Sequence, residues 1–168
     1  MLLIGGSVNQ TKIVHAAGQY LSETYDCYYT PAYCDGLLNS MRKWGLLEFT
    51  VLGNRIRKRS EAYIHEHGLQ LDYGGKARNY DLIVTTTDII WQRNLRRRPV
   101  ILVQEGMTDA EDWRYRLVKA TGLPRWLAGT ATLGLSNRYQ YFCVASQGYR
   151  ELFIRKGCRP EKIAVTGL

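Results

Sequence analysis

Residues 80–106 read YDLIVTTTDIIWQRNLRRRPVILVQEG and contain two short apolar runs, at 82–84 and 99–103. Unbroken apolar runs of this length are typical of parallel strands that are covered on both faces of a sheet. Each run ends in polar residues, TTTD after the first and QEG after the second. Open α/β sheets bind ligands at the carboxyl ends of their strands, so the stretch predicts an α/β fold with a ligand site at that edge.

The start of the chain shows the same kind of unit. A short apolar run at 2–4 is followed by Gly5-Gly6 and by a helix predicted over about 10–23, where apolar residues recur at helical spacing. Strand, glycine turn and helix form the opening unit of an α/β domain.

The remaining segments extend this pattern without an internal repeat or a low-complexity linker. Further strands are predicted at 25–33, 49–52, 141–145 and 163–165, and helices at 37–47, 54–67, 111–128 (interrupted at Gly122 and Pro124) and 148–156. A length of 168 residues suits one domain. We therefore predict a single doubly wound, Rossmann-like α/β domain with a mostly parallel sheet of about six or seven strands flanked by helices.

Composition and cysteine usage narrow the class of protein. Hydrophobic residues make up 45% of the chain and charged residues 23%, which is typical of a globular protein. No apolar stretch reaches the roughly 18 residues of a membrane span. Cys27, Cys34, Cys143 and Cys158 match no zinc or redox spacing, so we expect free thiols and a cytoplasmic location.

The net charge of +8 is unevenly distributed. Residues 1–84 carry 9 basic and 8 acidic side chains, whereas residues 85–168 carry 14 and 7. This asymmetry indicates an anionic partner: phosphate, nucleic acid or an anionic membrane surface. The arginine groups at 55–59 and 93–98 lack the interleaved aromatic residues of nucleic-acid modules, so nucleic acid is disfavoured and a solvated face is expected.

Bulky apolar and basic residues alternate between positions 113 and 127. The pattern fits a peripheral contact with the anionic inner face of a membrane, and it fits ordinary core packing equally well. The residues concerned are Trp113, Tyr115, Leu117, Trp126 and Leu127, with Arg114, Arg116, Lys119 and Arg125.

Three segments together resemble the N-terminal domain of GT-B-fold sugar enzymes. They are the opening strand with its Gly5-Gly6 turn, DLIVTTTD at 81–88 followed by PVILVQEG at 99–106, and YFCVASQGYRELFIRKGCRPEKIAVTGL at 141–168. This superfamily includes many glycosyltransferases and the UDP-N-acetylglucosamine 2-epimerases. The resemblance implies that residues 1–168 are the acceptor-side domain. It also implies that the C-terminal domain, which binds the nucleotide-sugar donor, is absent, and that the isolated chain is inactive.

Two carboxylates are candidates for acid-base catalysis. Glycosyl transfer needs a base for the acceptor hydroxyl, and Glu105 follows an apolar strand, where partial burial would raise its pKa. A loop carboxylate paired with arginine is the alternative. Asp88 resembles an acid-base residue of the epimerases, and a helix cap is its alternative.

The substrate-binding candidates come from the strand ends. One group is the first strand-to-helix loop, where glycines and a helix N-terminus suit an anion; it comprises Gly5, Gly6, Ser7, Asn9 and Thr11. The other group comprises Gln104, Gly106 and Ser146. The loop reads GGSVNQ and not GxGxxG, so no nicotinamide cofactor is expected. No metal is expected either, because the DxD device of metal-dependent transferases is absent.

These features predict the acceptor-binding half of a glycosyltransferase that uses a nucleotide-sugar donor and a sugar or lipid-linked acceptor, as in cell-surface polysaccharide or glycolipid synthesis. Two alternatives stay open: half of an epimerase-like enzyme, and a non-catalytic recruiting subunit of a split glycosyltransferase.

Overall fold

The computed structural model describes residues 1–31, 34–48 and 53–167. The chain divides into two compact units. Unit 1 comprises residues 1–86 and 91–99, and unit 2 comprises residues 87–90 and the chain from Val100 onward.

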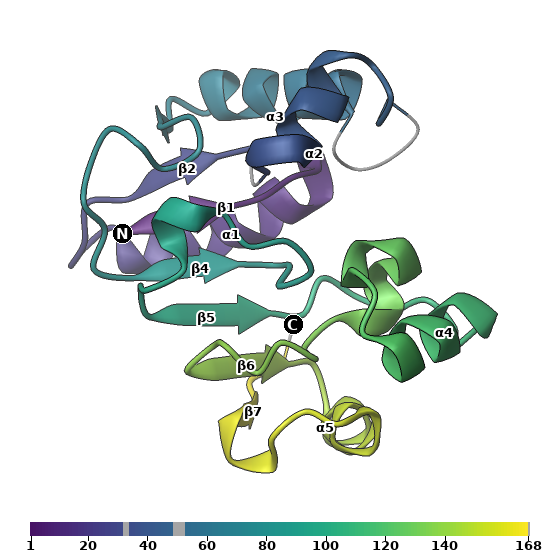
Figure 1. Cartoon of the computed structure of the whole chain (residues 1–168). Helices are drawn as coiled ribbons and strands as arrows, with labels where there is room; N and C mark the ends of the chain where they lie inside the picture. The colour runs from purple at the N-terminus through teal and green to yellow at the C-terminus, as the bar shows by residue number, and fades with distance from the viewer. Residues whose placement is uncertain (32–33, 49–52, 168) are drawn as a thin grey trace. The chain divides into compact units, whose positions relative to one another are not determined.

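Unit 1 is built on four parallel strands in the order β3-β2-β1-β4. Leu2 of the central strand β1 lies between Tyr28 of β2 and Ile83 of β4. Figure 1 shows α1 and α3 beside these strands. The elements are β1 (Leu2–Ile4), α1 (Val8–Leu21), β2 (Tyr28–Thr30), α2 (Gly36–Lys43), α3 (Asn54–Glu66), β3 (Gln70–Leu71), β4 (Ile83–Thr85) and the 3-10 helix η1 (Arg93–Leu95).

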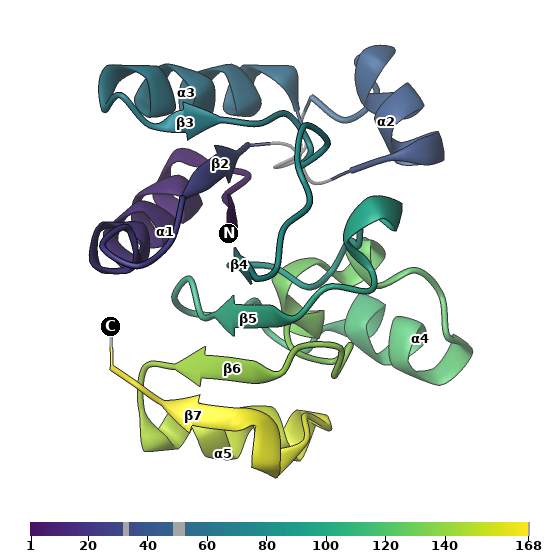
Figure 2. The same ribbon diagram turned by 90° about the vertical axis from the view of Figure 1, so that its left-hand side faces the viewer.

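Unit 2 is built on three parallel strands in the order β5-β6-β7. Figure 2 shows these strands side by side, with α5 packed next to β7. The elements are β5 (Val100–Val103), α4 (Trp113–Thr121), the 3-10 helix η2 (Arg125–Thr132), β6 (Tyr141–Val144), α5 (Gln147–Lys156), the 3-10 helix η3 (Pro160–Lys162) and β7 (Ile163–Val165).

The predicted fold class is confirmed. The described residues form seven strands, and the strands pair in parallel within each unit, with helices flanking them as in a Rossmann-like α/β protein. Strands β1 and β4 are buried at every position, as the unbroken apolar runs predicted. Each unit has its own core: Leu2, Val14 and Ile64 are fully buried in unit 1, and Leu102 and Phe153 in unit 2.

Several element boundaries differ from the prediction. The first helix begins at Val8 because Ser7 caps it. The 111–128 segment is two elements, since Gly122 ends α4 in the left-handed conformation (φ 70°). The short strand β3 was not predicted, because Gln70 and Leu71 carry no apolar run. The strand predicted at 49–52 lies outside the described residues.

No helix in the described part of the chain is long and apolar enough to cross a membrane.

Candidate functional site

The carboxyl ends of β5 and β6 are tied together by the side chain of Gln104. This side chain is fully buried; its Oε1 accepts from the backbone N–H of Ala145 at 3.1 Å, and its Nε2 donates to the carbonyl of Gly106 at 2.7 Å. Both polar groups of the amide are therefore used to fix the edge of the sheet. The side chain of Gln104, which the sequence predicts as a substrate ligand, thus makes two hydrogen bonds within the protein.

The residues next to Gln104 line the same edge of the strands β5 and β6. Glu105 is partly buried, and Gly106 (φ 155°) has nothing within 4 Å of the position that a Cβ would occupy. Ser146 caps α5, where its hydroxyl accepts from the N–H of Tyr149 at 3.3 Å. The structure thus brings Gln104, Glu105, Gly106 and Ser146 to one edge of unit 2, because β5 and β6 are adjacent and parallel.

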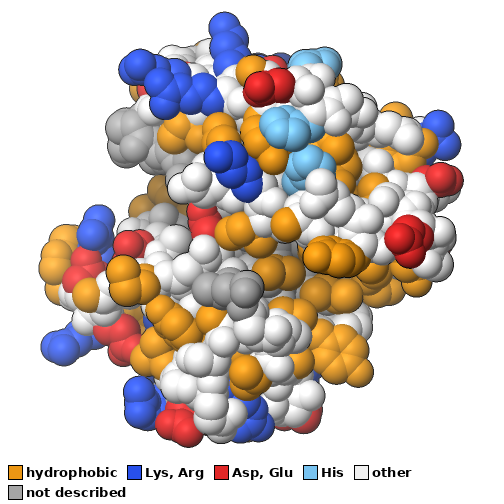
Figure 3. Space-filling view, turned by 180° about the vertical axis from the view of Figure 1, so that it is seen from behind, with side chains coloured by type: hydrophobic (Ala, Val, Ile, Leu, Met, Phe, Trp, Pro, Cys, Tyr) orange, Lys and Arg blue, Asp and Glu red, His pale blue; other side chains and the backbone are white. Residues whose placement is uncertain are grey.

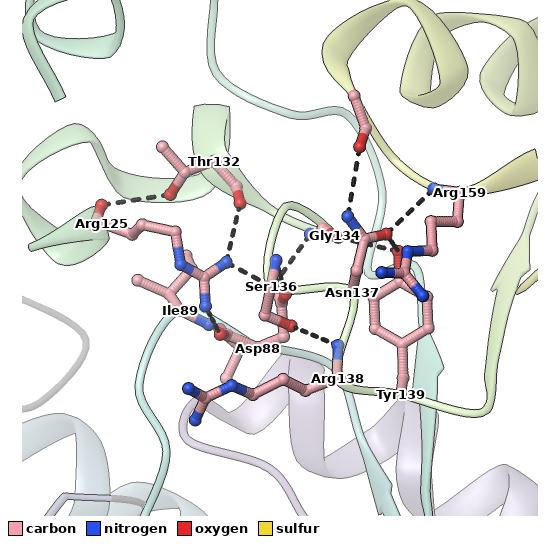
Figure 4. A network of polar contacts seen from close by, with 12 residues as sticks. Asp88, Ile89, Arg125, Thr132, Gly134, Ser136, Asn137, Arg138, Tyr139 and Arg159 are labelled. Atoms are coloured by element: carbon pink, nitrogen blue, oxygen red, sulfur yellow. Dashed lines mark hydrogen bonds and ion pairs between the residues drawn. The ribbon is translucent and has the colours of Figure 1, made fainter. Parts of the chain in front are cut away.

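Asp88, which also belongs to unit 2, has a different environment. Its side chain is fully buried, and its carboxylate accepts from the N–H of Gly134 at 2.8 Å, the N–H of Ser136 at 3.0 Å and Nη1 of Arg125 at 3.1 Å. Arg125 also donates to the backbone carbonyl of Asp88. Figure 4 shows these contacts converging on the carboxylate.

The Asp88 network continues into the turn that precedes β6. Asn137 holds a left-handed conformation (φ 51°); its Oδ1 accepts from the N–H of Arg159 at 2.9 Å, and its Nδ2 donates to the carbonyl of Gly157 at 3.2 Å. Asp88 caps none of the described helices. Its contacts anchor η2 and the 133–138 turn to the segment that follows β4.

The first strand-to-helix loop, in unit 1, satisfies its own backbone donors. The N–H groups of Gly6 and Ser7 donate to Oε1 of Gln10 at 2.8 and 3.1 Å, and the hydroxyl of Ser7 accepts from the N–H of Gln10 at 3.2 Å. This is a capping box, in which serine and glutamine three residues apart bond reciprocally. An anion at these amides would have to displace Gln10, a residue that we did not predict although the spacing signals it.

The remaining candidates of this loop are Thr11, Asn9 and Gly5. The hydroxyl of Thr11 donates to the carbonyls of Gly5 and Ser7 at 3.2 and 2.8 Å, and Asn9 is exposed on α1. A Cβ at Gly5 would lie 2.7 Å from the backbone of Thr11. Gly5 is therefore required for the close approach of α1 to β1.

The apolar and basic residues of 113–127 divide into two groups. Tyr115 is only 3% exposed and packs with Val118, Ala128 and Ala131, so it belongs to the core. Arg125 pairs with Asp88. The exposed large apolar residues of this segment are Trp113, Leu117, Leu123, Trp126 and Leu127, and Arg114, Arg116 and Lys119 are exposed among them.

Burial raises the pKa of the cysteine thiols and of a core tyrosine, which favours their neutral forms. All four cysteines are free thiols, as predicted, and burial raises the pKa of each, that of Cys158 to about 11. Burial also raises the pKa of Tyr29 to about 12. Within the described residues, no group of three or more His, Cys, Asp or Glu side chains is arranged to hold a metal ion.

Comparisons with known proteins identify no relative: the chain matches no protein family, no curated protein and no solved structure.

Proposed function

We propose that this chain is the acceptor-binding half of a glycosyltransferase that uses a nucleotide-sugar donor, with Glu105 as the general base. The observation that carries the proposal is the edge of unit 2, where the buried Gln104 amide fixes the ends of β5 and β6 and Glu105 follows it directly. The carboxyl ends of parallel strands are where open α/β sheets bind ligands.

The geometry suits proton abstraction from a sugar hydroxyl. A catalytic base must be held on a rigid element and must be reachable by the substrate. The hydrogen bonds of the buried Gln104 amide hold this edge rigid, and the open space beside Gly106 gives an acceptor room to approach the backbone. The hydroxyl of Ser146, on the neighbouring strand end, supplies a further polar group for the acceptor.

The environment of Asp88 favours the transferase over the epimerase alternative. The epimerase interpretation assigns acid-base roles to both Asp88 and Glu105. The Asp88 carboxylate already accepts from three donors, and releasing them would cost the contacts that hold the 133–138 turn. We therefore assign proton transfer to Glu105 and anchoring to Asp88.

A lipid-linked acceptor and a peripheral position at the cytoplasmic face of a membrane fit the surface of α4 and η2. Trp113 is 71% exposed, and Leu117 and Trp126 are exposed nearby in sequence, alongside the basic side chains of Arg114 and Arg116. Four free thiols suit the reducing cytoplasm. Co-sedimentation with anionic vesicles tests this membrane contact. Unchanged vesicle binding by a chain that carries both Trp113→Ser and Trp126→Ser would exclude a contact through this surface.

The catalytic assignment is tested by release of UDP or GDP from nucleotide-sugars when the chain is combined with a donor-binding domain and saccharide or lipid-linked acceptors. Glu105→Gln should lower the turnover number by about 10²–10⁴-fold, the usual contribution of a general base, with little change in the KM of the acceptor. Glu151→Gln, on the exposed surface of α5, is the matched control and should retain activity. Full activity of Glu105→Gln would contradict the assignment of Glu105 as the general base.

A further inference from the structure

Unit 1 contains two adjacent hollows that lie outside the candidate site. The larger, of about 600 Å³, is lined entirely by the η1 segment from Arg93 to Arg98. The smaller, of about 180 Å³, is lined by that segment and by the loop that precedes β4, from Gly75 to Tyr80. Asn94 and Arg98 line both hollows, so the two are adjacent at these side chains.

The lining of both hollows is strongly basic and contains no carboxylate. Its six cationic side chains are Lys76, Arg78, Arg93, Arg96, Arg97 and Arg98. Among the described residues, none of the six forms an ion pair, whereas Arg57, Arg114 and Arg125 each have a carboxylate partner. Two carboxylates contact the backbone of the lining: that of Asp35 accepts from the N–H of Arg93 at 2.6 Å, and that of Asp72 accepts from the N–H of Lys76 at 3.1 Å. Six cationic side chains thus face two carboxylates, so the hollows keep a net positive charge.

The floor of the smaller hollow is held rigid by buried polar contacts. The carboxylate of Asp72 accepts from the N–H groups of Lys76 and Ala77 at 3.1 and 3.0 Å and from the hydroxyl of Tyr80. The side-chain amide of Asn94 donates to the carbonyls of Gly74 and Gly75 at 3.0 and 2.9 Å, which ties the η1 segment to this loop.

Two of the cations are oriented by neighbouring side chains. The guanidinium of Arg98 donates to Oδ1 of Asn79 at 3.1 Å, and the guanidinium of Arg78 lies over the ring of Tyr28 at 4.7 Å. Preorganised guanidinium groups lose little entropy when they bind, and their planar donors match the oxygens of phosphate groups.

We propose that these hollows bind the diphosphate group of a small molecule, with one phosphate in each hollow and Arg98 between them. The charge of the linings suits two adjacent phosphates, because each hollow has three or more cationic side chains. The diphosphate site belongs to unit 1 and Glu105 to unit 2, and binding at this site does not depend on the proposed transferase activity.

A small ligand fits the lining better than a macromolecule does. Single-stranded nucleic acids are held by exposed aromatic side chains, and the only aromatic residue of the lining, Tyr80, is buried. A membrane surface would need exposed apolar side chains, and the apolar residue of the lining, Leu95, is buried as well.

Calorimetric titration of the full chain with inorganic diphosphate tests the proposal, with inorganic phosphate, UDP and farnesyl diphosphate in detergent as further probes. We expect saturable binding of one diphosphate per chain, with inorganic phosphate at least about tenfold weaker because it fills one hollow only. Binding of UDP or of farnesyl diphosphate through the same arginines would identify a nucleotide or a lipid as the source of the diphosphate.

Substitutions distinguish binding at the proposed diphosphate site from nonspecific electrostatic attraction to the basic chain. Arg98→Gln should weaken diphosphate binding at least about tenfold. If Arg98→Gln lowers the stability of the fold, a chain that carries both Arg96→Gln and Arg97→Gln, at exposed side chains, gives an independent test. Arg116→Gln, exposed on α4, carries the same change of charge and should bind as the unaltered chain does. Absence of binding, equal weakening by Arg116→Gln, or binding only to an oligonucleotide or to anionic vesicles would overturn the proposal.

Discussion

At the scale of single residues, Asp88 is a buried carboxylate whose contacts could not be read from its position in the sequence. Its position after an apolar strand suggested a cap or an acid-base group. The structure surrounds its carboxylate with donors from Arg125, Gly134 and Ser136, which lie 37 to 48 residues further along the chain. No local sequence pattern marks such partners, because they meet only once the turn before β6 has folded.

Removing the charge of Asp88 should therefore destabilise unit 2. Asp88→Asn would leave Arg125 without its carboxylate and place an amide NH2 group against N–H donors. We expect a loss of about 3 kcal/mol in the free energy of unfolding, near the lower end for a broken buried pair because Arg125 is partly exposed. Urea denaturation followed by circular dichroism measures this loss. Arg114→Gln, which breaks the exposed pair with Asp112, should change stability far less; equal effects of the two variants would contradict the anchoring role.

At the scale of elements, the start of α1 depends on the absence of a side chain at Gly5. A Cβ there would lie 2.7 Å from the backbone of Thr11, which α1 cannot accommodate without moving. Gly5→Ala should therefore lower stability by about 1–3 kcal/mol through overpacking.

The same substitution within a helix should have the opposite effect on stability. At Gly148, in α5, the nearest atom to a new Cβ is the hydroxyl oxygen of Ser146 at 3.8 Å. Gly148→Ala should raise stability by about 0.5 kcal/mol, because alanine has a lower conformational entropy in the unfolded chain. Chemical denaturation of both variants measures these changes in the free energy of unfolding. Unchanged stability of Gly5→Ala would show that the contact between α1 and β1 is looser than described.

The packing of α1 on α3 includes a histidine with a perturbed pKa. Nδ1 of His15 lies 2.9 Å from the hydroxyl of Tyr63, and the ring of His67 lies 5.3 Å away. Figure 3 shows histidine side chains close together near lysine and arginine side chains on this face. Burial, and then the positive charge of His67, lower the pKa of His15 below its usual value.

This lowered pKa predicts a pH dependence of stability. Because the unfolded chain binds the proton more readily, the contribution of His15 is complete above about pH 6.5 and is lost as the pH falls below that value. Thermal unfolding between pH 5 and 7.5 should show a midpoint that falls with acidification, and less steeply in His15→Gln. His65→Gln, exposed on α3, should keep the original slope; an unchanged slope in His15→Gln would assign the effect to other groups.

At the scale of the whole molecule, the sequence predicts the fold class and the edge of the sheet much better than it predicts the contacts there. The apolar run at 2–4 is buried at every position, whereas β5 alternates buried and half-buried positions. Parallel pairing of β5 with β6 then places Gln104 and Ser146 at one edge. The sequence cannot show that the Gln104 amide bonds to Ala145 and Gly106, because each contact depends on the register of β5 and β6. The arginine run at 93–98, which lines the larger hollow of unit 1, is visible in the sequence, but the smaller hollow also needs Lys76, which lies 22 residues before Arg98.

The most direct test of the proposed acceptor half is two-dimensional NMR of the ¹⁵N-labelled chain, titrated separately with soluble saccharide acceptors and with UDP- and GDP-sugars. We predict that a saccharide shifts the amide resonances of Gly106 and Ser146, and that nucleotide-sugars leave those of Gly6 and Ser7 unchanged because Gln10 already occupies their N–H groups. Shifts around Arg98 would report on the diphosphate site alone. Nucleotide-sugars that shift Gly6 and Ser7, together with saccharides that shift neither Gly106 nor Ser146, would contradict the assignment of this chain as an acceptor-binding half.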